Sequence, residues 1–131
     1  MSVNYSVLVV EPQAELRAVV AQHLTRRGYT VTAVDHPRQA LALATFRDFR
    51  TAVVAAQLPE IDCGTLVERL RRLIGEVGAV VLAEPTEMAG LPVWVRGVDR
   101  TLSTTQLEHA LSAAVLVPRN DDACELITQA N

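Results

Sequence analysis

Three short apolar runs stand out along the chain: residues 7–10, 52–56 and 79–83. None of them shows the alternation of apolar and polar positions that is typical of a half-exposed strand. Uninterrupted runs of this length predict strands that are covered on both faces, as in the middle of a parallel sheet. A fourth segment, residues 29–34, alternates apolar residues with Thr, and it predicts a less buried strand near an edge.

Segments with helical periodicity separate these runs. Apolar residues recur in them at intervals of three and four, which predicts amphipathic helices. A short polar segment, residues 84–90, precedes the extended stretch that begins at Val93, and it has room for one or two helical turns at most. The segments with helical periodicity are about 13–27, 38–47, 65–74 and 104–117.

The predicted strands and helices alternate along the whole chain. Such alternation is typical of a parallel sheet with helices on both faces. With right-handed crossovers, five strands give the flavodoxin-like order 2-1-3-4-5. We therefore predict an α/β fold, a flavodoxin-like (βα)5 three-layer sandwich with a shortened or missing fourth helix. In this interpretation residues 1–118 form one domain, and residues 119–131 form a C-terminal tail or linker.

Composition narrows the classes of function. The chain has 131 residues and a formal net charge of −3, which gives no reason to expect a nucleic-acid partner. All 12 basic residues are Arg, so mechanisms that need a lysine amine are excluded. No run approaches the roughly 20 apolar residues of a membrane span, and residues 1–10 lack the basic region of a signal peptide. The two Cys residues lie far apart and indicate reduced thiols, so we expect a cytoplasmic protein.

Several short motifs together resemble the receiver domain of bacterial two-component response regulators, the CheY-like family. The resemblance covers about residues 5–117. It implies a domain that accepts a phosphoryl group on an Asp at the end of the third strand. Acids after the first strand would hold Mg²⁺, and a Ser or Thr and a Lys would end the fourth and fifth strands. The cation and the Lys neutralise charge on the phosphoryl oxygens. The motifs are Val7-Leu8-Val9-Val10-Glu11, Glu15-Leu16-Arg17, Arg27-Gly28-Tyr29-Thr30-Val31, Gln39-Ala40-Leu41, Leu58-Pro59, and Asp62 with Gly64.

The chain departs from the family at the residues that carry this chemistry. Counting back from the Leu-Pro motif places Ala55 at the phosphoacceptor position, and a methyl group cannot be phosphorylated. Glu11 keeps the first acid, but its neighbour Pro12 offers no ligand. Ala83 takes the place of the Ser or Thr, and Arg100 that of the Lys. These five residues predict a vestigial phosphorylation pocket in a pseudo-receiver that is not an enzyme and has no metal or cofactor.

We expect Glu11 and Arg100 to form an ion pair across this vestigial pocket. Both residues follow strands at the same edge of the sheet, and a guanidinium can bind a carboxylate bidentately. Such a pair would hold the domain in one state without phosphorylation. Two alternatives stay open. The domain could be an active receiver phosphorylated on a displaced acid, Asp62 or Glu84. It could also bind a small apolar ligand in the space that the two Ala residues leave.

The resemblance also implies how such a domain works. Receivers associate through their first, fourth and fifth helices and the strands beside them. Here the fourth helix is curtailed, so we expect altered partner contacts around residues 93–100 and the last helix. The predicted function is that of a phosphorylation-independent module that contacts other signalling proteins or effector domains. A homodimer is left open, and neither nucleic acid nor membrane is expected as a partner. The candidate partner face comprises Trp94, Arg96, Asp99, Leu102 and Glu108.

Overall fold

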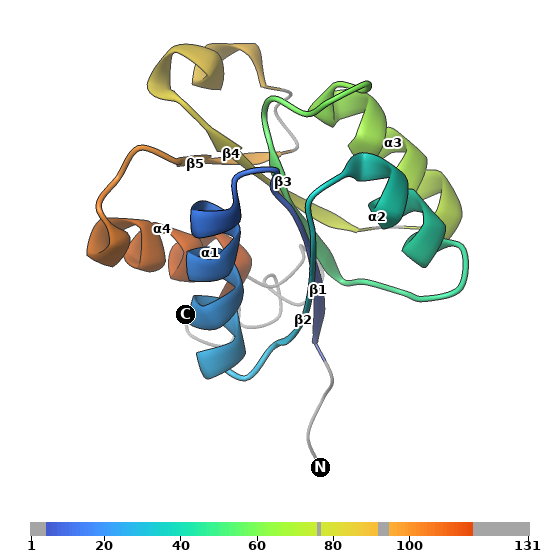
Figure 1. The fold of residues 1–131 in the computed structure, drawn as a ribbon, viewed down its shortest axis with the longest axis horizontal. Coiled ribbons are helices and arrows are strands. Elements are labelled where there is room, and N and C mark those ends of the chain that lie inside the picture. The colour runs from blue at the N-terminus through green and yellow to red at the C-terminus, as the bar shows by residue number, and fades with distance from the viewer. Residues whose placement is uncertain (1–4, 76, 92–94, 117–131) are drawn as a thin grey trace, which may run out of the picture.

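A computed structural model describes residues 5–75, 77–91 and 95–116 of the chain. Five parallel strands form one sheet in the order β2-β1-β3-β4-β5 (Figure 1). This is the predicted order, and it places the Thr-rich second strand at one edge. The strands are β1 (Ser6–Val10), β2 (Thr30–Val34), β3 (Thr51–Ala55), β4 (Gly78–Ala83) and β5 (Arg96–Asp99).

Helices cover both faces of the sheet, as the flavodoxin-like prediction requires. Helices α1 and α4 pack side by side on one face, and α2 and α3 on the other (Figure 1). Within the described part of the chain, no helix is both long and apolar enough to cross a membrane. The helices are α1 (Ala14–Arg26), α2 (Pro37–Ala44), α3 (Cys63–Ile74) and α4 (Thr104–Leu116).

The central strands are buried on both faces, which explains their uninterrupted apolar sequence. All five residues of β3 are buried. Along β1 the side chains alternate between two separate core clusters, because successive residues of a strand point to opposite faces. Val7 and Val9 pack with α1 and α4, whereas Leu8 and Val10 pack with α2 and α3.

The connection between β4 and β5 confirms the prediction of a shortened fourth helix. It forms a six-residue 3₁₀ helix, η1 (Pro85–Gly90), which begins at a Pro in the position that a helix start favours. Its Met88 lies so close to Gly97 of β5 that a Cβ atom there would collide with the Met sulfur. The strand itself begins at Arg96; residues 92–94, where the sequence predicted its start, lie outside the described residues.

Candidate functional site

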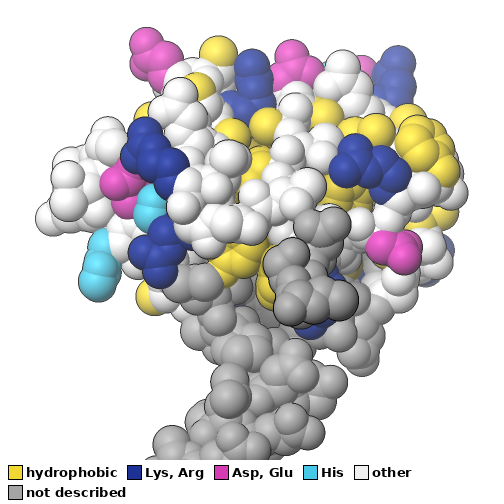
Figure 2. Space-filling view, turned by 90° about the horizontal axis from the view of Figure 1, so that it is seen from below, with side chains coloured by type: hydrophobic (Ala, Val, Ile, Leu, Met, Phe, Trp, Pro, Cys, Tyr) yellow, Lys and Arg dark blue, Asp and Glu magenta, His cyan; other side chains and the backbone are white. Residues whose placement is uncertain are grey.

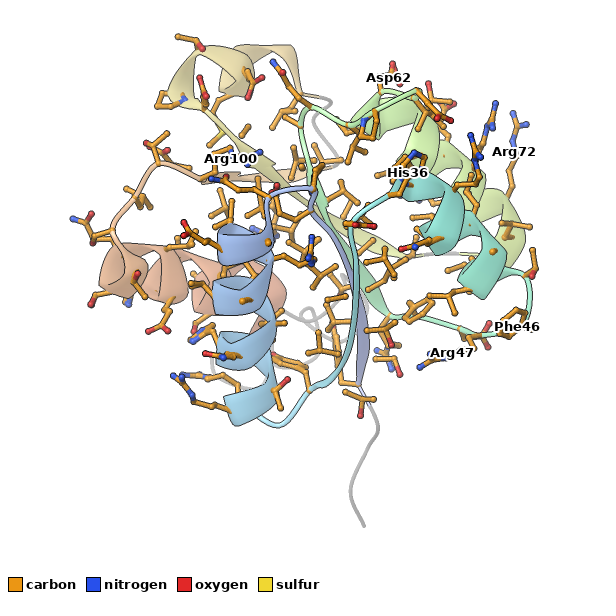
Figure 3. The ribbon with its side chains drawn as sticks, viewed as in Figure 1. His36, Phe46, Arg47, Asp62, Arg72 and Arg100 are labelled. Carbon is orange, nitrogen blue, oxygen red and sulfur yellow. The ribbon has the colours of Figure 1, made fainter. Side chains whose placement is uncertain are left out.

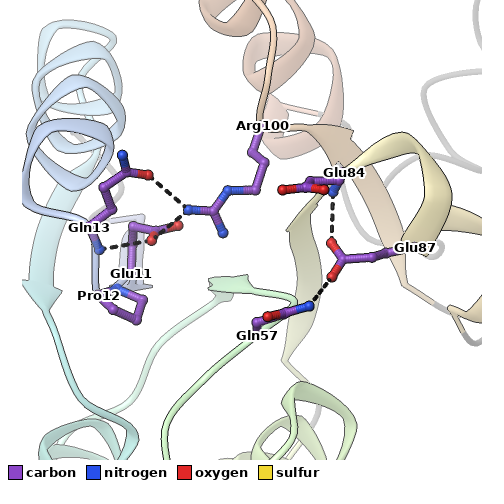
Figure 4. Close-up of a pocket in the computed structure, with 7 residues that line it drawn as sticks. All are labelled: Glu11, Pro12, Gln13, Gln57, Glu84, Glu87 and Arg100. Atoms are coloured by element: carbon purple, nitrogen blue, oxygen red, sulfur yellow. Dashed lines mark hydrogen bonds and ion pairs between the residues drawn. The ribbon is translucent and has the colours of Figure 1, made fainter.

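The carboxyl ends of four strands converge on one edge of the sheet, as expected for the site of an open α/β fold. Glu11 follows the last residue of β1, and Arg100 follows the last residue of β5. Ala55 and Ala83 are the last residues of β3 and β4. A pocket of about 300 Å³ opens above this edge (Figure 4). Its lining residues are Glu11, Pro12, Gln13, Gln57, Glu84, Glu87 and Arg100.

Glu11 and Arg100 form the expected ion pair. The Arg100 Nη2 lies 3.0 Å from Glu11 Oε2, and the two side chains are 17% and 1% exposed. The contact joins one nitrogen to one oxygen and is not bidentate, and the same Nη2 also donates to Gln13 Oε1 at 3.1 Å. The backbone N–H of Gln13 donates to Glu11 Oε2 at 2.9 Å. Glu11 Oε1 is buried and has no hydrogen-bond partner among the described residues.

The sheet fixes the backbone on both sides of this pair. The N–H of Glu11 donates to the carbonyl of Val34 at 3.1 Å, and the N–H of Arg100 donates to the carbonyl of Ala83 at 3.0 Å. Both bonds extend strand pairings by one residue. The pair is therefore held by the strand ends, whose spacing follows from the sheet, and not by a loop.

Two residues without a role in the sequence prediction line the other side of the pocket. Gln57 donates from Nε2 to Glu87 Oε2 at 2.7 Å, and the backbone N–H of Glu84 donates to Glu87 Oε1 at 2.8 Å (Figure 4). These donors, with the nearby charge of Arg100, lower the pKa of Glu87 below its ordinary value. Gln57 was visible as the polar residue after the third apolar run. The position of Glu87 depends on the exact course of η1, and the sequence indicated only one or two helical turns there.

The pocket differs from the space expected for an apolar ligand. Ala55 and Ala83 are 0% exposed, so they lie beneath the site and leave no opening. The lining is instead polar and charged, because the carboxylates of Glu84 and Glu87 and the side chains around Arg100 face it. This lining does not favour an apolar ligand, since its entry would strip water from several polar groups.

Of the two displaced acids considered as phosphoacceptors, only Glu84 lines the pocket. Asp62 instead caps α3, because its Oδ1 accepts from the N–H of Thr65 at 2.9 Å. Hydrogen bonding to the side chain of Thr65, and then to its backbone N–H, lowers the pKa of Asp62. The prediction that Asp62 could substitute for the missing acid is not supported by this geometry, since its carboxylate is committed to the helix start.

The predicted partner face is only partly presented to solvent, and its role stays a prediction. Arg96 is exposed, and Asp99 accepts a hydrogen bond from the N–H of Thr101 at 2.9 Å. Leu102 packs against the core cluster beneath α1 and α4. Glu108 faces α1, with its Oε2 3.8 Å from Nη1 of Arg26. Trp94 lies outside the described residues.

The residues at this edge do not fit the Mg²⁺ that the resemblance implies. Mg²⁺ requires oxygen ligands in a nearly octahedral arrangement around the ion. Glu11 offers a carboxylate, but its Oε2 is occupied by a guanidinium, whose charge repels a second cation. Pro12 contributes no side-chain oxygen. Within the described ranges, no group of three or more His, Cys, Asp or Glu side chains could hold a metal ion.

Comparisons with known proteins agree with the fold. A scan against models of protein families gives no match. Over 66 residues the chain is 38% identical to the transcriptional regulatory protein TcrA of Mycobacterium tuberculosis. Those residues make up 50% of this chain and 26% of TcrA, so the chain spans about a quarter of the curated relative that it matches.

Solved receiver domains resemble the chain over most of its length. CheY4 of Vibrio cholerae aligns with a TM-score of 0.72 and 21% identity, covering 86% of this chain and 99% of that one. A signal receiver domain of an HD domain-containing protein from Pseudomonas fluorescens Pf-5 has a TM-score of 0.71 and 22% identity, covering 87% and 96%. The receiver domain of the hybrid histidine kinase CckA has a TM-score of 0.68 and 21% identity, covering 84% and 98%. At these identities the likeness establishes a CheY-like fold.

Proposed function

We propose that this chain is a pseudo-receiver of two-component signalling, a domain that takes up no phosphoryl group and regulates other proteins by contact. The observation that carries the proposal is that two features occur together at the carboxyl edge of the sheet. A buried Ala55 stands where the acceptor would be, and Arg100 binds the one carboxylate, Glu11, that remains after β1.

The charged residues at this edge support a domain that keeps one conformation without phosphorylation. In phosphoryl transfer, cations stabilise the charge of the incoming group. Here Arg100 is already engaged by Glu11 and Gln13. A guanidinium stays charged at any physiological pH, so the pair is not released by proton loss from Arg. A domain whose switch edge is tied in this way holds one conformation without a chemical signal.

Regulation then depends on which proteins the domain meets. The similarity to part of a transcriptional regulatory protein supports an effector domain or another signalling protein as the partner. We expect no catalysis by this domain and a place in the cytoplasm. The exposed Arg96 and the neighbouring Asp99 are the residues of the predicted partner face through which contacts at β5 would be made.

Intact-mass spectrometry after incubation with Mg²⁺ and acetyl phosphate tests the proposal directly. We expect no phosphoryl adduct on the full chain, while a receiver that retains its Asp, treated in parallel, gains one. Because the chain has no Lys, acetylation of side-chain amines does not confuse the spectrum.

A stoichiometric phosphoryl adduct would overturn the proposal, and two variants would then locate it. Loss of the adduct in Glu84→Gln would favour an active receiver that uses the acid at the pocket. Loss in Asp62→Asn would place the phosphoryl group on the cap of α3.

A further inference from the structure

A second concave surface lies between α2 and α3, away from the carboxyl ends of the strands. It is a groove of about 460 Å³ with a mainly apolar lining. Leu41 and Leu73 supply apolar side chains to it, and Arg69 and Arg72 lie on the α3 side. The full set of lining residues is Leu41, Ala42, Thr45, Arg69, Arg72 and Leu73.

One exposed large hydrophobic side chain lines this groove, and a second follows a lining residue in the sequence. Leu73 lines it and is 47% exposed, and Phe46, which directly follows the C-cap of α2, is 72% exposed. A single exposed hydrophobic residue needs no explanation. In the described part of the chain, however, these are the two large hydrophobic residues that are exposed, and both lie where α2 and α3 end. An apolar surface concentrated in this way is typical of a contact site.

Two Arg side chains of α3 line the same surface. Arg69 and Arg72 are three residues apart, so they lie on one side of the helix (Figure 3 labels Arg72). Arg47, which follows Phe46, lies instead over the ring of Phe49. Figure 2 shows dark-blue Arg side chains beside hydrophobic ones on the right of the molecule, the side on which α2 and α3 lie in Figure 1, with an acidic side chain close by. Asp48 follows Arg47 in the sequence and Glu68 precedes Arg69, but no acidic residue lines the groove. A second copy packed symmetrically on this face would bring Arg against Arg, which disfavours a dimer here.

The chain carries a segment of complementary chemistry beyond α4. Residues 119–131 lie outside the described part of the structure, and their sequence contains three acids and one Arg. An apolar pair, Leu126-Ile127, directly follows Glu125. The segment therefore has acids for the Arg residues and apolar side chains for the groove.

The segment begins on the correct edge of the sheet. Helices α2 and α3 end where β3 and β4 begin, so the groove residues near their ends lie at the amino edge of the sheet. Helix α4 follows β5 and packs back along it, so Leu116 lies at that same edge. Leu126 lies ten positions beyond Leu116, and a chain of that length spans up to about 35 Å. Crossing from one helix layer to the other requires about 20 Å, two packing layers of about 10 Å each.

We propose that residues 119–131 of this chain bind the groove between α2 and α3. Leu126 and Ile127 enter it beside Leu73, and the acids at 121, 122 and 125 face Arg69 and Arg72. The bound segment covers an apolar surface that would otherwise be available to a partner. This contact is independent of the proposed receiver function, because it lies on a different part of the molecule from the vestigial pocket.

Paramagnetic relaxation in the full chain tests the contact. Cys63→Ser leaves Cys124 as the single thiol, to which a nitroxide is attached. Isotope-labelled Ile methyl groups report the distance, and the three Ile residues are Ile61, Ile74 and Ile127. Ile61 and Ile74 lie near opposite ends of α3, about 18 Å apart by its length. We expect the Ile74 signal to lose most of its intensity and the Ile61 signal to retain most of its own.

Charge-reversal variants separate specific binding from general attraction. Arg69→Glu with Arg72→Glu should restore the Ile74 signal, whereas Arg27→Glu with Arg96→Glu, the same charge change elsewhere, should leave it attenuated. Equal effects on Ile61 and Ile74, no attenuation, or equal effects of the two double variants would each overturn the proposal. Attenuation that disappears on dilution with unlabelled chain would assign the contact to a second copy, and would overturn it as well.

Discussion

Removing the Arg100 side chain should lower the free energy of unfolding more than breaking an exposed ion pair does. The side chain of Glu11 is 1% exposed, so Arg100→Gln leaves a nearly buried carboxylate without its cation. Breaking a buried pair in this way costs about 3–5 kcal/mol. The N–H of Gln13 still binds Glu11, and Arg100 is partly exposed, so we expect a loss of about 2 kcal/mol in the free energy of unfolding.

A double-mutant cycle isolates the pair from the rest of the site. Urea unfolding, followed by circular dichroism, gives the free energies for the parent chain, Glu11→Gln, Arg100→Gln and the double variant. With both groups neutral, no charge remains buried, so the double variant should lose little more than either single one. The coupling energy should then be about 1.5–2 kcal/mol.

The pair between Arg38 and Glu60 provides the matched control. Its atoms are closer, at 2.6 Å, but its side chains are 76% and 55% exposed. Solvent screens such a pair, so its coupling should be much smaller and should fall further in high salt. If the cycle at Glu11 and Arg100 gives no more coupling than this exposed pair, the argument from burial is wrong, and with it the proposed locking of the strand edge.

Two further predictions concern the helices. Burial lowers the pKa of His23 below its ordinary value of 6.5, with nearby Arg26 and Arg27 lowering it and Glu108 opposing the shift. The unfolded chain therefore binds this proton more readily than the folded one. The contribution of neutral His23 to stability is fully present above pH 6.5 and is lost as the pH falls from there towards the lowered pKa. His23→Gln should make the urea midpoint less dependent on pH in this window, whereas substitution of the exposed His109 by Gln should leave that dependence unchanged. Asp62→Ala removes the cap on the N–H of Thr65 and should lower the melting temperature, and Asp62→Asn, which can still accept this bond, should restore most of it.

The fold could be predicted from sequence because its signals are local and repeated. Runs such as 52–56 and the helical periodicity around them define βα units, and right-handed connection then leaves little choice of strand order. Gly28, at a positive φ of 97°, marks the end of the first unit, where a side chain would be strained. The shortened fourth helix could also be predicted, because the seven residues 84–90 cannot form the usual helix of a crossover.

The site could be predicted only where strand ends specify it. Glu11 and Arg100 each follow a strand directly, so the sheet brings them together. Their geometry was less accessible, because the single-nitrogen contact depends on the amide of Gln13 competing for the guanidinium. Asp62 was considered only as an alternative acceptor, and its carboxylate instead accepts from a free N–H at the start of α3, as an acid at a helix start commonly does. The groove between α2 and α3 arises from the packing of two helices, which periodicity alone does not describe.

The division of the core into two clusters bears on how information could pass through the molecule. Val7 and Val9 belong to one cluster, and Leu8 and Val10 to the other, with the backbone of the sheet between them. Side chains on opposite faces are therefore not in one packed network. A change at α1 or α4 would therefore have to displace the strands themselves in order to reach the groove between α2 and α3. The central strands separate the two clusters. Substitutions in one cluster and in the other should therefore change the free energy of unfolding in a nearly additive way.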